Sequence, residues 1–270
     1  MTDNVTKLFQ NTIILDTETT SLDFKVAEVI EWASAPLMEI VETVATEEYK
    51  IRCNQLYKPS KPLPQEISAI TTITNRMIDA GATCAFDDDL ATIQTELNHH
   101  DYYVAHNAFY DANILARYSL KMPRQICTMR LAEKLYADDV NIKEYNLSYL
   151  RYALDIPVSD SLVAHRADAD IIVTGMLFTT LLDKALADGE IDANADDLGF
   201  ELVKYLEKPV KITTMPFGKH KGKKLVDVPL DYWLWALDKM DSLQENKPEY
   251  DKDFAASVAE AVQEIFDNTN

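Results

Sequence analysis

The stretch N-T-I-I-L-D-T-E-T, residues 11–19, places a short apolar, β-branched run directly before two acids. This composition predicts a β-strand over 11–17. Side chains two positions apart share one face of a strand, so Asp16 and Glu18 point the same way as Ile14. Their backbones then lie roughly 7 Å apart, which lets both carboxylates converge on one or two cations. A solvent-exposed strand end is the alternative, because D-x-E is a common pattern.

Outward from this strand, the hydrophobic pattern predicts an alternation of strands and helices. Further strands are expected at 26–40, 48–57, 101–105 and 124–127. Helices are expected at 86–97, 107–118, 129–136, 146–153 and 167–187. Strands first, and then strands alternating with helices, predict an α/β fold with a mixed sheet flanked by helices.

Composition limits the classes of function. The chain has 270 residues, is 47% hydrophobic and carries a formal net charge of −19, which excludes wholesale disorder and a general affinity for polyanions. Any nucleic-acid site must therefore be local. Three widely spaced cysteines give no C-x-x-C pair, so neither a zinc ribbon nor a disulfide framework is expected. Residues 1–10 do not resemble a signal peptide and no stretch is apolar enough to span a membrane, so we expect a cytoplasmic protein (host cytoplasm if viral).

A change in charge predicts how the chain is divided. Residues 188–207 hold seven acids and one lysine, whereas residues 208–224 hold six lysines and no acid. We therefore predict a first domain over 1–187, an acidic linker over 188–207 and a small lysine-rich module over 208–270 that could contact DNA.

A second acidic site is predicted where a strand meets a helix, at residues 104–111. Asn107 is a favourable N-cap residue. Asp111 lies one turn into the helix in register with Ile114 and Leu115, so a carboxylate occupies the core-facing stripe. An acid that stabilises the helix N-terminus is the alternative. His106 could equally be a hydrogen-bonded histidine of the junction.

A third site precedes the helix predicted at 167–187. That helix is apolar nearly all round, which predicts that it is buried. Asp170 lies in its first turn, and His165 lies just before it, where a loop can place the ring over a site. We interpret Asp170 as functional and Asp168 as an acid that the helix N-terminus favours.

Taken in order, D-T-E at 16–18, H-N-A-x-x-D at 106–111 and H-R-A-x-x-D at 165–170 resemble the DEDDh 3′–5′ exonuclease family. The segments 126–132 and 215–223 resemble one group within it. The resemblance implies an RNase H-like fold and two divalent cations, Mg²⁺ or Mn²⁺, held by four carboxylates. The residues that match the family's catalytic positions are Asp16, Glu18, Asp111 and Asp170 as metal ligands and His165 as general base. Thr71 and Ser21 stand where many members have His and Gly.

The same resemblance implies that the protein hydrolyses DNA from a free 3′ end and releases nucleoside 5′-monophosphates. The chemistry suits these residues, because two cations roughly 4 Å apart can neutralise a phosphodiester, and a histidine can accept a proton from water near neutral pH. A 3′–5′ RNA exonuclease, an inactive nucleic-acid-binding or polymerase-associated module, and a metal phosphatase stay open as alternatives.

Substrate contacts are expected in two places. Beside the acids, we expect them from Thr17, Thr19, His106 and Asn107. In the lysine-rich module, we expect phosphate contacts from Lys219, Lys221 and Lys223, with Phe217 stacking on a base. A solvated hairpin is the alternative for these lysines. Tyr232, Trp233 and Trp235 are expected to form the small core of the module.

Overall fold

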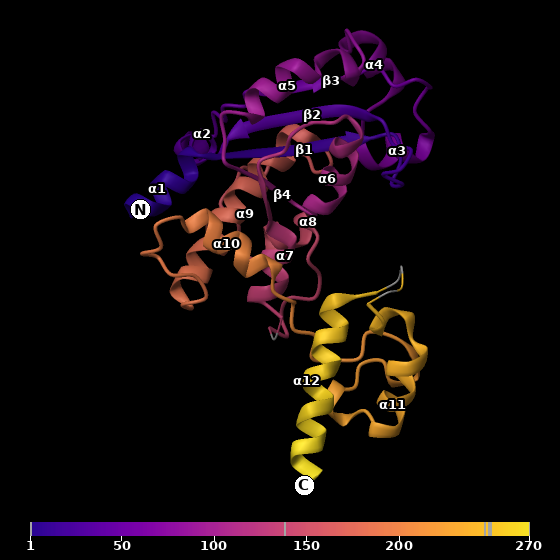
Figure 1. Cartoon of the computed structure of the whole chain (residues 1–270). Coiled ribbons are helices and arrows are strands. Elements are labelled where there is room, and N and C mark those ends of the chain that lie inside the picture. Colours follow the sequence, from indigo (N-terminus) through magenta and orange to yellow (C-terminus); the bar gives the residue numbers. More distant parts are fainter. Residues whose placement is uncertain (1, 138, 246, 248–249, 270) are drawn as a thin grey trace. The chain divides into compact units, whose positions relative to one another are not determined.

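The computed structural model describes residues 2–137, 139–245, 247 and 250–269 (Figure 1). The chain divides into two compact units. The sheet unit comprises Met1–Leu131 and Ile142–Leu206, and the C-terminal unit comprises Ala132–Asn141 and Glu207–Asn270. Within the described ranges, no helix has the length and apolar character needed to cross a membrane.

The sheet unit is built on a five-stranded mixed sheet of order β3-β2-β1-β4-β5 (Figure 1). β1 is the central strand; β2 and β3 run antiparallel to their neighbours, whereas β4 and β5 run parallel. The strands are β1 (Thr12–Thr19), β2 (Val29–Pro36), β3 (Cys53–Leu56), β4 (Tyr102–Ala105) and β5 (Arg124–Cys127). The predicted mixed sheet is confirmed, and its centre is the strand that carries Asp16 and Glu18.

Helices cover this sheet, and the longest of them is the most buried. α9 packs against β1 and β2, where the missing side chain of Gly175 lets Ile40 and Ile14 approach closely. The helices are α1 (Asp3–Gln10), α2 (Leu37–Thr43), α3 (Gln65–Thr71), α4 (Asn75–Gly81), α5 (Leu90–Leu97), α6 (Ala108–Arg117), α7 (Thr128–Leu135), α8 (Leu147–Ala153), α9 (Ala167–Ala187) and α10 (Leu198–Glu207). Short 3₁₀ turns occupy η1 (Val44–Thr46) and η2 (Phe86–Asp89).

Several elements differ from the sequence prediction. The strand expected over 48–57 is limited to β3, and α3 and α4 were not predicted. The strand expected over 26–40 ends at Pro36, and α2 begins there, because proline has no N–H to extend a ladder. Residues 3–10, which look polar by count, form α1. The stretch predicted as an acidic linker, 188–207, contains α10, because leucines four residues apart give that helix an apolar stripe: Leu198, Leu202 and Leu206 are all buried.

The C-terminal unit has its own small core. A hairpin pairs residues 213–215 with 222–225, and its apolar side chains pack with those of α11 and α12. The elements are η3 (Gly218–His220), η4 (Leu225–Asp227), α11 (Leu230–Lys239), η5 (Asp241–Leu243) and α12 (Lys252–Thr269).

The three aromatic residues predicted as the core of this unit separate in the structure. Trp233 is fully buried and Tyr232 is half-buried, but Trp235 is 52% exposed. The prediction for Trp235 is therefore wrong. A helix turns about 100° per residue, so Trp235 points roughly 200° away from Trp233, to the other side of α11.

Candidate active site

The three predicted motifs meet at one cleft of about 590 Å³ in the sheet unit. The end of β1, the turn between β4 and α6, and the loop before α9 supply its polar walls. The predicted residues that line it are Asp16, Thr17, Glu18, Thr19, His106, Asn107, His165 and Asp170. Residues more than 150 positions apart in the sequence therefore share one cavity.

Three carboxylates form the centre of the cleft. One oxygen each from Asp16, Glu18 and Asp170 lies within 4.8 Å of the other two, a grouping that could hold a metal ion. Burial and the neighbouring negative charges raise the pKa of Asp16 well above its usual range. For the same reasons the pKa of Glu18 rises to about 8 and that of Asp170 to about 7. Acids this close in a buried site favour a bound cation.

Asp111 is a fourth buried acid close enough to act electrostatically on this group. It lies outside the set of three oxygens, on the buried face of α6 beside Ile114 and Leu115, as predicted, and is only 3% exposed. The Thr17 hydroxyl donates a hydrogen bond of 2.6 Å to Asp111 Oδ1. Burial raises the pKa of Asp111 to about 7, while this hydrogen bond opposes the rise. The charge of Asp111 also contributes to the raised pKa of Asp16.

His165 stands at the mouth of the cleft on the loop that precedes α9. Its side chain is exposed, and its backbone adopts a left-handed φ of 61°. The backbone N–H of His165 donates to Asp170 Oδ2 over 3.1 Å. The same loop is held by the buried Arg151, which donates to the carbonyl oxygens of Leu162 (3.1 Å) and Ser159 (2.7 Å).

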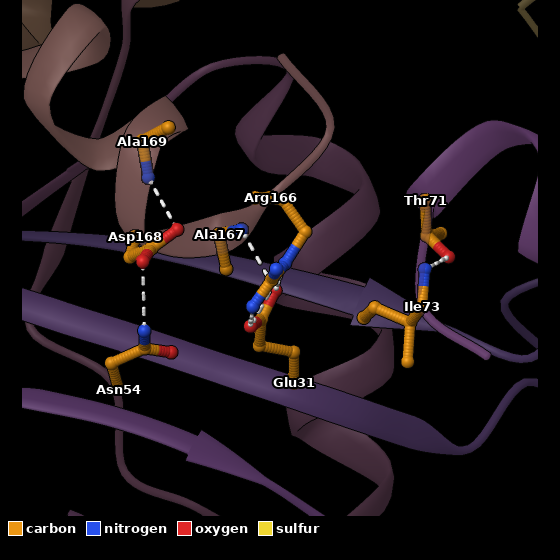
Figure 2. Close-up of polar contacts among 8 residues, drawn as sticks. All are labelled: Glu31, Asn54, Thr71, Ile73, Arg166, Ala167, Asp168 and Ala169. Atoms are coloured by element: carbon orange, nitrogen blue, oxygen red, sulfur yellow. Dashed lines mark hydrogen bonds and ion pairs between the residues drawn. The ribbon is translucent and has the colours of Figure 1, made fainter. Parts of the chain in front are cut away.

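A fifth acid, Glu31, was not singled out from the sequence. It is completely buried on β2, directly across the ladder from Glu18. Figure 2 shows the Arg166 side chain turned toward it; Arg166 Nη2 lies 2.6 Å from Glu31 Oε1. The backbone N–H of Ala167 donates to Glu31 Oε2 over 2.9 Å. The segment directly after His165 is thereby tied to the sheet.

Asp168 makes structural contacts, in line with our interpretation of the sequence. The Asn54 side-chain amide donates to Asp168 Oδ2, and the backbone N–H of Ala169 donates to Oδ1, each over 2.9 Å (Figure 2). Asp168 and Asp170 thus have different environments. Asp168 is hydrogen-bonded to Asn54 of β3, whereas Asp170 lines the cleft.

His106 is engaged locally on both ring nitrogens. Nε2 lies 2.9 Å from the carbonyl oxygen of Tyr145, and Nδ1 lies 2.9 Å from Thr128 Oγ1. A carbonyl only accepts, so Nε2 carries the proton and Nδ1 accepts from the threonine. Burial lowers the pKa of His106 to about 4, which keeps the ring neutral. The junction role that the sequence left open describes this side chain well.

Asn107 does not cap α6 through its side chain. Its backbone is left-handed (φ 55°, ψ 43°), a conformation that asparagine tolerates better than most residues, and its side chain makes no capping bond. The N-cap prediction is therefore wrong in its geometry. The exposed amide lines the cleft instead.

Thr19 and Thr71 also line the cleft. Thr19 Oγ1 donates to the carbonyl oxygen of Ser21 over 2.9 Å and contacts the Tyr110 hydroxyl. Thr71 is buried in α3, and its hydroxyl donates to the carbonyl oxygen of Ile67. The same hydroxyl accepts the N–H of Ile73 (Figure 2). The predicted lysines, in contrast, belong to the C-terminal unit.

Comparisons with known proteins show which proteins this chain resembles in sequence and in fold. Exodeoxyribonuclease 10 of Escherichia coli (strain K12) is 29% identical over 240 residues, which cover 85% of this chain and 92% of the relative. A solved exonuclease X in complex with 5′-overhanging duplex DNA is 24% identical and covers 71% of this chain and 99% of its own, with a TM-score of 0.49. A solved exonuclease I matches with a TM-score of 0.51 at 14% identity, over 72% of this chain and 42% of that one, which confirms the predicted fold class.

Two family models match the chain. One, described as "Putative quorum-sensing-regulated virulence factor", matches residues 204–240. The other, described as "Exonuclease", matches residues 13–178 and includes the three carboxylates, Asp111 and His165. Since that match spans more than half of the 270 residues, this chain belongs to the exonuclease family and is a nuclease.

Proposed function

We propose that this protein is a metal-dependent 3′–5′ exodeoxyribonuclease that releases nucleoside 5′-monophosphates. The observation that carries the proposal is the grouping of Asp16, Glu18 and Asp170 within 4.8 Å in an open cleft, with Asp111 buried beside them. The similarity to a protein named exodeoxyribonuclease, over most of both chains, supports DNA as the substrate.

The acids suit hard divalent cations. Carboxylate oxygens are the ligands that Mg²⁺ and Mn²⁺ prefer, and none of the residues that line the cleft is a cysteine. We assign Asp16, Glu18, Asp111 and Asp170 as ligands of two ions. When bound, such ions neutralise the phosphodiester and make water a stronger nucleophile at neutral pH. The raised pKa values of these acids show how poorly the site tolerates its own charge without cations.

His165 is our candidate for the general base. It is the one predicted catalytic residue with an exposed side chain, so its ring can reach water and substrate in the cleft. Its backbone N–H donates a hydrogen bond to Asp170, and the residue lines the same cleft as the three carboxylates, which supports this assignment. In this position it takes a proton from the attacking water.

The terminal nucleotide needs contacts to its base and sugar as well as to its phosphate. The lining of the cleft includes the exposed apolar side chains of Leu22 and Ile70 and the polar side chain of Asn107. We assign these groups to the base and sugar of the terminal nucleotide. Thr17, expected as a substrate contact, acts through Asp111 instead, because its hydroxyl is already donated there.

The lysine hairpin has a separate role in this proposal. Lys219, Lys221 and Lys223 are all exposed on the hairpin of the C-terminal unit. We assign them to phosphate contacts. Replacing all three with Gln should weaken binding to single-stranded DNA and reduce the slope of log affinity against log salt by about 2, at roughly 0.7 for each contact. An unchanged slope would leave the hairpin as a solvated surface.

The proposal is tested by digestion of one DNA sequence with a 3′-hydroxyl or a blocked 3′ end, with and without Mg²⁺. We expect nucleoside 5′-monophosphates from the 3′-hydroxyl strand alone, and only with the metal. Matched RNA forms a parallel arm, in which faster digestion would replace DNA by RNA as the substrate. Internal cleavage, or no turnover on either polymer, would contradict the assignment.

A further inference from the structure

The C-terminal unit exposes one large aromatic side chain, Trp235, although tryptophan is usually buried in a protein core. The chain has three tryptophans; Trp32 and Trp233 are fully buried, whereas Trp235 is 52% exposed on α11. Its ring lies beside that of Tyr232, with 5.5 Å between ring centroids. Tyr232 is itself braced by Trp233 on one side (5.6 Å) and by His220 (4.6 Å) on another. Trp235 therefore projects from a packed aromatic group formed by Tyr232, Trp233 and His220.

One lysine of the hairpin lies over the Tyr232 ring of this aromatic group. Lys219 Nζ lies 5.1 Å from the centroid of the Tyr232 ring, a cation–π distance. Burial, with the nearby Lys223 and Lys219 charges, lowers the pKa of His220. In the described part of the chain, no ion pair joins Lys219, Lys221 or Lys223 to an acid. Their charge remains available.

Phe217, which the sequence suggested as the stacking ring, is a weaker candidate. Its ring packs on Phe254 with 5.2 Å between centroids, and it is 39% exposed. Trp235 is larger and more open, and it lies next to the tyrosine that carries the Lys219 contact.

An exposed indole next to the tyrosine that Lys219 contacts matches one kind of occupant. Bases of single-stranded nucleic acid stack on aromatic rings, and their phosphates seek lysines; a duplex keeps its base faces covered. We propose that Trp235, together with Tyr232 and Lys219, forms a base-stacking site for single-stranded DNA on the C-terminal unit. The choice of DNA rests on the proposed nuclease function, whereas the stacking geometry stands on the unit itself.

The test uses the full-length protein in EDTA, so that binding is measured without turnover. Because the other two tryptophans are buried, quenching of tryptophan fluorescence by a thymidine 15-mer reports on Trp235. We expect quenching in the wild type and its loss in Trp235→Phe, while Trp235→Phe keeps most of the affinity for a dye-labelled 15-mer. Trp235→Ala should weaken that affinity about tenfold, the loss expected for one stacked base.

Leu234→Ala is the matched control, because Leu234 is the neighbouring exposed apolar residue of α11 at 58% exposure. It should bind as the wild type does. Equal affinities for Trp235→Ala and Leu234→Ala, or equal quenching by a blunt duplex, would overturn the single-strand site. If the protein digests DNA but its fluorescence is not quenched, the stacking site is refuted and the nuclease function stands. If its fluorescence is quenched but it does not digest DNA, the nuclease function is refuted and the stacking site stands.

Discussion

At the scale of single residues, the pairing of Asp111 with Thr17 gives a clean test of the fourth acid. Asp111→Asn keeps the size of the side chain and its acceptor oxygen for Thr17, so the fold should be retained. The negative charge is lost, and we expect turnover to fall on the order of 10²–10³-fold. Digestion of a labelled oligonucleotide gives the rate, and the melting temperature gives the fold. A variant that is folded and fully active would remove Asp111 from the site.

His165 makes a different prediction, because it is exposed and outside the carboxylate group. His165→Ala should lower turnover about 10²–10⁴-fold, the range for loss of a general base. Its affinity for Mn²⁺, measured by calorimetry, should stay close to that of the wild type. Wild-type speed in this variant would exclude the general-base role, and loss of Mn²⁺ binding would show that the ring is a ligand.

At the scale of elements, the Glu31–Arg166 pair links β2 to the start of α9. Glu31→Gln leaves the Arg166 guanidinium, which is 24% exposed, without its ionic partner. Breaking such a pair should lower the free energy of unfolding by about 2–4 kcal/mol, a discounted form of the cost for a fully buried pair. Urea unfolding measures the loss.

The matched control for this pair is Glu39→Gln, since the ion pair of Glu39 with Arg52 is more exposed. That change should cost less than about 1 kcal/mol. Equal losses of unfolding free energy in the two variants would show that the buried Glu31–Arg166 pair stabilises the protein no more than an exposed ion pair does.

The same scale shows what the sequence could predict. β5 and α9 are found at the predicted residues, because each has a clear sequence signal. Pro123 directly precedes β5, and α9 is apolar nearly all round. Asp16, Glu18, Asp111, His165 and Asp170 were predicted from strand and helix periodicity and from the family motifs. Glu31 was missed because an acid inside an apolar strand reveals its role only through a partner 135 positions away. The exposure of Trp235 depended on which face of α11 the hairpin covers.

At the scale of the whole molecule, the acid centre should make stability depend on pH and metal. The pKa values of Asp16, Glu18, Asp111 and Asp170 are raised in the folded chain. Between about pH 4.5 and pH 8 these four acids therefore bind fewer protons in the unfolded chain than in the folded one, and their contribution to the free energy of unfolding falls as pH rises. In EDTA, the melting temperature should be lower at pH 8 than at pH 5.5.

Metal should reverse this trend, because a cation stabilises the ionised acids and binds only the folded site. Mg²⁺ should raise the melting temperature more at pH 8 than at pH 5.5. Asp16→Asn is the control, since it removes one acid of the group and should flatten both effects. A metal-free protein whose melting temperature does not fall over this range, or that ignores Mg²⁺, would argue against the assigned site.

If acids from β1, α6 and α9 hold two cations side by side, a crystal structure with Mn²⁺ and thymidine 5′-monophosphate should contain both of them in the cleft. Anomalous scattering should show two peaks about 4 Å apart, both within bonding distance of oxygens from Asp16, Glu18, Asp111 or Asp170, with the nucleotide phosphate between them. Peaks elsewhere, or none in the cleft at saturating Mn²⁺, would contradict the account.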